Sequence, residues 1–324
     1  MAKKAYLFAK ELAQYGPTSN PTKLSLDQAQ AYCSWFTHAN SENFSVISWF
    51  IPPKFIPSME AVYAFCRWSD DLGDESGSPE KSIGLLRWWQ GELNEAFADP
   101  PSAKHPILIA LTKVATDNHL DQDLFERLIK AFQLDQTKTR FSTRREVLDY
   151  CHLSANPVGE IVLTLFGFIN KENLHLSNCI CTGLQLTNFW QDVKRDLEIG
   201  RIYLPGEDMD RFGITEADFK NRKATEPLRK LIRYEVDWAE DLFTQGEGLP
   251  DKVQGSLGEQ IRLFLAGGRA ILAKIRQENY QSIEMRPTLT KWDKSGLITI
   301  GLMRLLRHWL LSPFRRRSER SRIH

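Results

Sequence analysis

Apolar residues spaced three and four positions apart recur along most of the chain, whereas alternation of apolar and polar residues is scarce. The spacing is plain in residues 124–132, 158–169 and 228–243, each of which predicts a helix with one buried stripe. Proline and glycine clusters separate the predicted helices; they lie at residues 52–57, 73–79, 100–101, 200–205 and 246–250. The pattern predicts an all-α fold, with one large domain over residues 1–290 and a tail over residues 291–324.

The composition excludes several classes of protein. The 324 residues are 42% hydrophobic and carry 42 Lys+Arg against 41 Asp+Glu, as in an ordinary globular protein. Neither a disordered chain nor a collagen has this composition, and a net charge of +1 gives no support to nucleic-acid binding. Five cysteines without a CxxC pair argue against a disulfide framework or a zinc site and suit a reducing interior.

The location of the protein follows from its apolar runs and its charge distribution. No run reaches the ~20 apolar residues of a transmembrane helix, and the N-terminus lacks the pattern of a secretory signal, so we expect a cytoplasmic protein. Residues 291–324 carry nine Lys+Arg and two Asp+Glu, a net charge of +7, which leaves −6 on residues 1–290. This basic amphipathic tail suits peripheral contact with the inner face of the cytoplasmic membrane. The alternative is that its apolar side packs on the domain.

The first chemical feature is a pair of aspartates, Asp70 and Asp74, which lie four residues apart and therefore on one helix face. The face continues back through Cys66 and Val62, which indicates that it points inward. Arg67 lies one turn before Asp70 on nearly the same side. Two negative charges on an inward face destabilise the fold by repulsion and by the cost of burial. A divalent cation bound to both carboxylates would replace that repulsion with attraction.

A second acidic stripe lies on a predicted helix that ends near Gly200. Steps of three, four and four residues place its polar side chains on one face: Gln185, Asn188, Asp192 and Asp196. Carboxylate and amide oxygens suit Mg²⁺, and two such acidic pairs facing a helical cavity could hold metal ions that bridge a diphosphate and stabilise it as a leaving group. The alternative is that both pairs are solvated helix faces.

Three stretches together resemble the squalene/phytoene synthase family over about residues 20–290. The stretches are Tyr63-Ala64-Phe65-Cys66-Arg67 followed by Asp70, Asp71 and Asp74; Tyr150-Cys151 leading to Val158-Gly159-Glu160; and Asn188, Asp192 and Asp196 followed by Gly200-Arg201-Ile202-Tyr203-Leu204-Pro205. The resemblance implies a single all-α isoprenoid-synthase domain around a central cavity. It also implies a prenyl diphosphate substrate and a site with two or three Mg²⁺ ions.

The resemblance implies roles for individual residues as well. The implied Mg²⁺ ligands are Asp70, Asp71, Asp74, Asn188, Asp192 and Asp196. The implied catalytic residues are Asp70, Asp74, Asp192, Asp196, Tyr150 and Tyr203. The implied substrate contacts are Ser41, Phe44, Tyr63, Arg67, Asp135, Asn156, Gln185, Asn188 and Arg286. Aromatic rings, Trp190 among them, could stabilise carbocations through their π faces, although large aromatic residues more often serve packing.

Within the family, several stretches resemble the bacterial hydroxysqualene synthases of hopanoid biosynthesis. They are Glu42-Asn43-Phe44, Ser154-Ala155-Asn156-Pro157-Val158-Gly159, Leu186-Thr187-Asn188-Phe189-Trp190-Gln191-Asp192, and Arg286-Pro287-x-Leu289-x-Lys291-Trp292. Two positions depart from the phytoene and dehydrosqualene types: Gln191 replaces an arginine, and Asn40-Ser41-Glu42 replaces a His-Ser-Lys type of stretch. Because two cationic contacts are missing, we expect a substrate that carries one diphosphate.

The reaction implied is the ionisation of presqualene diphosphate, rearrangement of the cation and capture by water, which gives hydroxysqualene and diphosphate without NADPH. Other enzymes of squalene and hopanoid biosynthesis are then the expected protein partners. Two alternatives stay open at this point. The chain could be a presqualene diphosphate, squalene or phytoene synthase that condenses two prenyl diphosphates, or a membrane-bound helical scaffold without activity.

Overall fold

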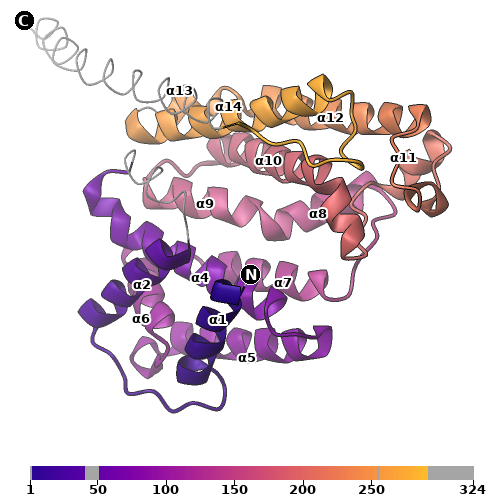
Figure 1. Cartoon of the computed structure of the whole chain (residues 1–324). Helices are drawn as coiled ribbons and strands as arrows, with labels where there is room; N and C mark the ends of the chain where they lie inside the picture. Colours follow the sequence, from indigo (N-terminus) through magenta and orange to yellow (C-terminus); the bar gives the residue numbers. More distant parts are fainter. Residues whose placement is uncertain (1, 41–50, 254, 291–324) are drawn as a thin grey trace, which may run out of the picture. The chain divides into compact units, whose positions relative to one another are not determined.

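The structure is a computed structural model that describes residues 2–40, 51–253 and 255–290. Within these ranges the regular structure is helical, and the single β-bridge, from Arg140 to Ile202, extends into no strand (Figure 1). The predicted all-α class is therefore confirmed. None of the described helices is long and apolar enough to cross a membrane. The predicted tail over residues 291–324 lies outside the described residues, so its separation from the domain stays a prediction.

The helices group into two units. The N-terminal unit comprises Met1–Thr139 and Arg145–Ile169. Its helices are α1 (Ala2–Tyr15), α2 (Leu26–Asn40), α4 (Ile56–Asp74), α5 (Pro79–Ala98), α6 (Pro106–Asn118), α7 (Gln122–Asp135), α8 (Arg144–Ser154) and α9 (Asn156–Leu165), with 3₁₀ turns η1 (Pro53–Phe55) and η2 (Pro100–Ser102). Several helices begin as their sequences dictate: Ser78 caps α5 by accepting a hydrogen bond from the Lys81 N–H, and Asp121 caps α7.

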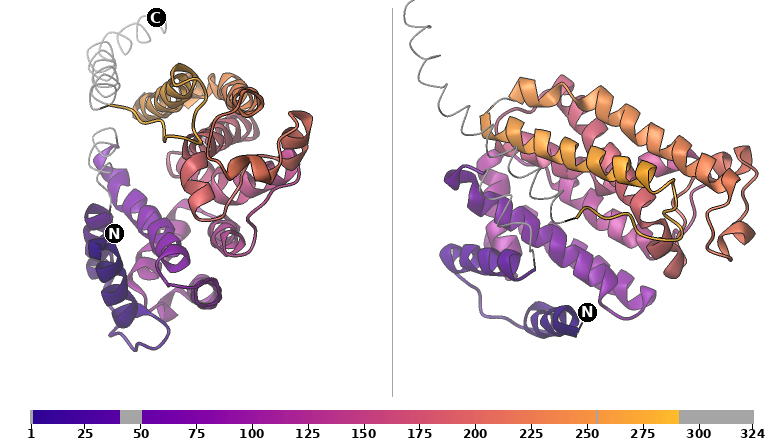
Figure 2. Two further views of the ribbon diagram at one scale, coloured as in Figure 1. Left: turned by 45° about the vertical axis from the view of Figure 1, so that its right-hand side comes forward. Right: turned by 45° about the horizontal axis from the view of Figure 1, so that its top comes forward.

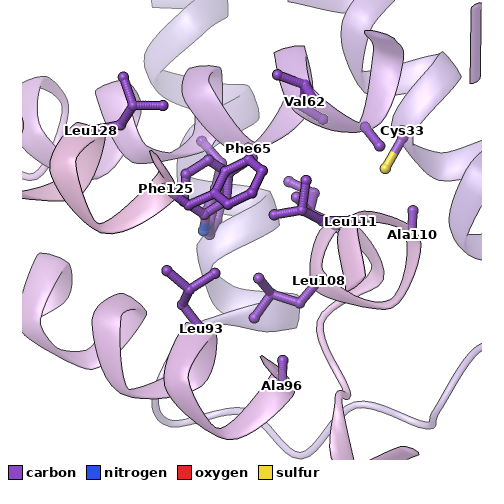
Figure 3. Packing of buried hydrophobic residues seen from close by; sticks show 14 of the residues in the cluster. Cys33, Val62, Phe65, Leu93, Ala96, Leu108, Ala110, Leu111, Phe125 and Leu128 are labelled. Atoms are coloured by element: carbon purple, nitrogen blue, oxygen red, sulfur yellow. The ribbon is translucent and has the colours of Figure 1, made fainter. Parts of the chain in front are cut away.

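The core of the N-terminal unit surrounds α4, which packs against α2, α5, α6 and α7. Phe65 of α4 meets Phe125 of α7 edge-on, with ring centroids 5.2 Å apart (Figure 3). Both rings are fully buried, as are Trp68 and Trp89. Burial of one such side chain stabilises the fold by roughly 1.5–3 kcal/mol. The buried aromatic face therefore fixes the rotation of α4 and with it the directions of the aspartates in its last turns.

The C-terminal unit comprises Arg140–Arg144 and Asn170–His324. Its described helices are α10 (Lys171–Glu198), α11 (Gly206–Arg211), α12 (Glu226–Gly246), α13 (Leu249–Val253) and α14 (Gly255–Gln277), with the 3₁₀ turn η3 (Glu216–Phe219). Asn170 caps α10 by accepting from the Asn173 N–H. The helix ends at Glu198, and the φ of 78° at Gly200 just beyond it allows the Arg201 N–H to reach back to the Asp196 carbonyl at 2.7 Å.

Three long helices form the body of the C-terminal unit: α10 packs against both α12 and α14 (Figure 2). The approach is close where Gly183 of α10 and Gly268 of α14 face the ring of Phe243 from α12. Beyond α14, residues 281–290 have no regular helix and return to α10; we call this segment the strap.

Candidate active site

The first acidic motif occupies the last turns of α4. The buried side of the helix carries Phe65 and Trp68, so the aspartates that follow differ in exposure: Asp71 is buried, Asp70 is half-buried and Asp74 is exposed. The predicted sharing of one helix face by Asp70 and Asp74 agrees with this helix. Asp71, which the spacing argument did not use, lies deepest.

Arg67 binds the two aspartates that follow it. Its Nη2 lies 2.7 Å from Asp71 Oδ1 and its Nε lies 3.2 Å from Asp71 Oδ2, which makes a two-point ion pair. Its Nη1 lies 3.1 Å from Asp70 Oδ2. The guanidinium is held by helix spacing alone, because residues three and four apart are neighbours on a helix surface.

The carboxylates of this motif repel one another. Burial raises the pKa of Asp70 to about 7, and the neighbouring Asp74 carboxylate adds to the rise while Arg67 opposes it. Burial also raises the pKa of Asp71, again against the effect of Arg67. One guanidinium therefore does not offset the negative charge of this turn. A site with this surplus of negative charge attracts a cation.

Two more predicted site residues of the N-terminal unit are bonded to each other. The Tyr150 hydroxyl of α8 donates to Asp135 Oδ2 at the end of α7, at 3.0 Å. Tyr63 donates from its hydroxyl to the Asn40 carbonyl at 3.4 Å. Asn156 is buried in the first turn of α9. Ser41 and Phe44 lie outside the described residues.

The second acidic motif lies along α10. Of its predicted stripe, Gln185, Asp192 and Asp196 are half-buried and Asn188 is exposed. Beside this stripe, the apolar residues Leu186, Phe189 and Val193 are buried and Leu197 is half-buried. Trp190 is fully buried, with its ring centroid 6.5 Å from that of Trp238, and it also lines the pocket beside Tyr203.

The strap brings Arg286 to the second motif. Arg286 Nε donates to Asp192 Oδ1, and its Nη2 lies 3.3 Å from Asp192 Oδ2. Gln191, next to Asp192 on α10, donates from Nε2 to the Pro287 carbonyl at 2.6 Å. Sequence reasoning assigned Arg286 to the substrate, but it missed this contact with Asp192. The only signal in the sequence was the uncharged Gln191 beside Asp192.

The segment that follows α10 places Tyr203 against the same helix. The rings of Tyr203 and Phe189 stack with centroids 3.8 Å apart and planes 7° apart. A pocket beside this stack is lined by both rings and by Asp196 and Arg201, among others. The stacked pair lies at the end of the α10 acidic stripe, and Phe141 also stacks on the buried ring of Tyr203, with centroids 5.4 Å apart.

The donor set fits Mg²⁺ that shares its coordination with a ligand. Magnesium binds carboxylate oxygens, keeps several waters and takes phosphate oxygens from its substrate, so it needs only one or two carboxylates at a time. Among the described residues, no group of three or more His, Cys, Asp or Glu side chains is arranged to hold a metal ion unaided. Asp70 in the N-terminal unit and Asp192 in the C-terminal unit each fit a site where Mg²⁺ also takes oxygens from a ligand, and neither fits a closed structural site.

A family model described as squalene/phytoene synthase matches residues 37–293. The hydroxysqualene synthase of Zymomonas mobilis subsp. mobilis is 30% identical over 241 residues, which cover 72% of this chain and 77% of the relative. The phytoene synthase of Arthrospira platensis is 27% identical over 289 residues, which cover 84% of this chain and 92% of the relative.

Two solved structures are also similar to this chain. The squalene synthase HpnC from Alicyclobacillus acidocaldarius is similar with a TM-score of 0.75 and 41% identity, over 79% of this chain and 95% of that one. A dehydrosqualene synthase in complex with a ligand is similar with a TM-score of 0.71 and 26% identity, over 87% and 98% of the two chains.

Proposed function

This chain belongs to the squalene/phytoene synthase family, whose members are enzymes that act on prenyl diphosphates, and on that premise we propose that it is a hydroxysqualene synthase. The proposed substrate is presqualene diphosphate and the products are hydroxysqualene and diphosphate. The observation that carries this proposal is the burial and hydrogen bonding of the uncharged Gln191 side chain. Its carboxamide is uncharged, buried and bonded to the Pro287 carbonyl, so it offers no cation to a second diphosphate. The relatives named hydroxysqualene synthase add support.

In the proposed reaction, Asp70 and Asp74 would hold Mg²⁺ on α4, and Asp192 and Asp196 would hold Mg²⁺ on α10. When bound, Mg²⁺ would supply Lewis-acid stabilisation of the departing diphosphate. Arg67 keeps the Asp70 carboxylate in place by its ion pair at 3.1 Å.

The carbon–oxygen bond to the diphosphate breaks, and the diphosphate leaves with the bonding electron pair. The resulting carbocation rearranges beside the aromatic face of Tyr203, which its stack on Phe189 holds rigid. A water molecule, oriented by Asn156, then forms the new carbon–oxygen bond and passes a proton to the released diphosphate or to solvent water. No electron pair is transferred from a reductant, so the proposed reaction needs no NADPH.

The test is product analysis with two substrates. We expect the purified full-length protein, given presqualene diphosphate and Mg²⁺ without NADPH, to release hydroxysqualene. We also expect no turnover of farnesyl diphosphate alone. Formation of presqualene diphosphate, squalene or phytoene from prenyl diphosphates would overturn the proposal in favour of the condensing type. The relatives named phytoene synthase support that alternative.

A matched pair of variants tests whether the chain is an enzyme at all. Asp192→Asn removes one carboxylate of the α10 motif, and Asp241→Asn removes an exposed carboxylate of α12. We expect the first to lower turnover by at least a hundredfold and the second to leave it unchanged, because loss of about 2.7 kcal/mol of leaving-group stabilisation is a factor of about 100. Equal complementation by wild type and Asp192→Asn in cells would favour the inactive scaffold.

A further inference from the structure

The strap covers α10 through contacts that converge on Gln191 and its neighbours. Gln191 Nε2 donates to the Pro287 carbonyl at 2.6 Å, and Lys194 Nζ donates to the Glu284 carbonyl at 3.0 Å. Ile283 and Pro287 of the strap are themselves buried. The contacts join residues about 90 positions apart in the chain, so tertiary contacts hold the strap on α10. We call the α10 residues that bind it, Gln191 and Lys194, the seat of the strap.

Arg286 contacts two adjacent residues of α10, Asp192 and Gln191. Its guanidinium bonds both oxygens of Asp192, and its Nη2 also lies 3.5 Å from Gln191 Oε1. Gln191 therefore faces the strap with both ends of its carboxamide: the donor end binds the Pro287 backbone and the acceptor end binds the neighbouring side chain. Because the Gln191 side chain is held at both ends, it restricts the position of Arg286 more than the ion pair with Asp192 alone would.

From this geometry we infer that Gln191 is a positioning residue that seats the strap, and that the seated Arg286 is a built-in counter-ion of Asp192 which competes with Mg²⁺ for the carboxylate. Both oxygens of Asp192 accept from Arg286, and a divalent cation on the same carboxylate is repelled by the guanidinium. The strap then weakens Mg²⁺ binding until a diphosphate draws Arg286 away from Asp192. The inference rests on the metal-binding role of Asp192 in the proposed function.

The charge at this turn follows from the same arrangement. With Arg at position 191, as in other family types, a permanent cation would stand beside Asp192 and no carboxamide would hold Pro287. Here the cation comes from the strap, and its charge is neutralised by Asp192 in the metal-free protein. Arg286 is 45% exposed and Asp192 is 19% exposed, so the pair is accessible to a competing ion.

Calorimetric titration with Mg²⁺ alone, without diphosphate, tests the competition. We expect Arg286→Gln to bind Mg²⁺ about threefold to tenfold more tightly than wild type, the range of a partly exposed ion pair. Gln191→Met, which keeps the volume and removes both polar ends, should shift affinity in the same direction. The double variant should equal Arg286→Gln alone, because Gln191 acts through Arg286. Arg195→Gln, on the exposed side of the same helix turn, is the matched control and should bind as wild type does.

Hydrogen exchange of the strap amides gives a readout that needs no metal. Gln191→Met should exchange faster over residues 281–290, with α12 unchanged, whereas Arg195→Gln should match wild type. Slow exchange in Gln191→Met, additive effects in the double variant, or identical Mg²⁺ affinities would each overturn the inference. If no variant binds Mg²⁺ although the strap loosens as expected, the seat stands and the metal role in the proposed function fails.

Discussion

Arg67 holds Asp71 in a two-point ion pair, with Nη2 2.7 Å from Oδ1 and Nε 3.2 Å from Oδ2. Asp71 is the buried member of the α4 motif, and its side chain is 4% exposed. Asp71 fixes the guanidinium, which in turn reaches Asp70. In the proposed function, Asp70 and Asp74 would hold the metal ion.

The first prediction concerns Asp71. Asp71→Asn should lower the free energy of unfolding by about 1 kcal/mol, because Arg67 loses its two-point partner and keeps only the contact with Asp70, while removal of a buried carboxylate of raised pKa offsets part of the loss. Urea denaturation without metal measures the change. The double variant Asp71→Asn with Arg67→Gln should lose less than the sum of the single variants. Unchanged stability of Asp71→Asn would show that the Arg67–Asp71 ion pair does not stabilise the fold.

The second prediction has the opposite sign. The folded protein raises the pKa of Asp70 from 3.8 to about 7, so at pH 8 its negative charge disfavours the folded state. Asp70→Asn should raise the free energy of unfolding of the metal-free protein by about 1 kcal/mol, after discounting for solvent screening and for the lost contact with Arg67.

The same Asp70→Asn protein should bind Mg²⁺ and diphosphate more weakly, and calorimetry measures this in parallel. A gain in stability joined to a loss of ligand binding is the expected signature of a carboxylate kept for function. Asp74→Asn is the control for stability, since its exposed side chain should change the free energy of unfolding by less than about 0.5 kcal/mol. Destabilisation by Asp70→Asn would contradict the prediction.

Helix spacing predicted what lies within one helix. The apolar stripe of residues 124–132 lies in α7 and that of 228–243 in α12, and Arg67 does lie beside Asp70. The stripe of 158–169 runs past the end of α9: Gly167 has a φ of 75°, and Ile169 is 42% exposed beyond it. A positive φ at one glycine ends the helix, although the apolar spacing continues.

Contacts between distant residues had no local signal. Gln191 and Pro287 are 96 residues apart, and no periodicity links them. The sequence marked Gln191 as unusual without showing what it binds. In the same way, nothing near the adjacent Gly267 and Gly268 in the sequence indicates what they contact. The structure assigns Gly268 a packing role, which depends on a ring from another helix.

The third prediction uses these two glycines of α14. A Cβ added at Gly268 would lie 2.5 Å from Cζ of Phe243, whereas one at Gly267 would meet nothing within 4 Å. Gly268→Ala should therefore lower the free energy of unfolding by about 1–3 kcal/mol through overpacking. Gly267→Ala should raise it by about 0.5–1 kcal/mol, since alanine favours a helix interior. Thermal unfolding of the two proteins checks the pair, and equal shifts would show that the helices can move apart without loss.

The fourth prediction concerns a histidine buried among aromatic rings. His105 caps α6, with Nδ1 accepting from the Ile107 N–H at 3.2 Å, and its ring lies 4.8 Å from that of Trp89 and 5.2 Å from that of Trp68. Its Nε2 is buried without a hydrogen-bond partner in the described part of the chain. Burial lowers the pKa of His105 from 6.5 to about 3, so the ring is neutral in the folded protein at physiological pH.

Between pH 6.5 and about 3 the unfolded chain therefore binds a proton at His105 that the folded protein does not. The free energy of unfolding should fall as the pH drops through this window, by up to about 1.4 kcal/mol per pH unit from this one group. His105→Asn keeps an acceptor for the helix cap and cannot titrate. Its stability at pH 7 should be lower because the aromatic cluster loses a ring, but its decline from pH 6.5 to pH 4.5 should be shallower than that of wild type. Urea denaturation at several pH values compares the two slopes, and parallel curves would mean that His105 is protonated in the folded protein as readily as in the unfolded chain.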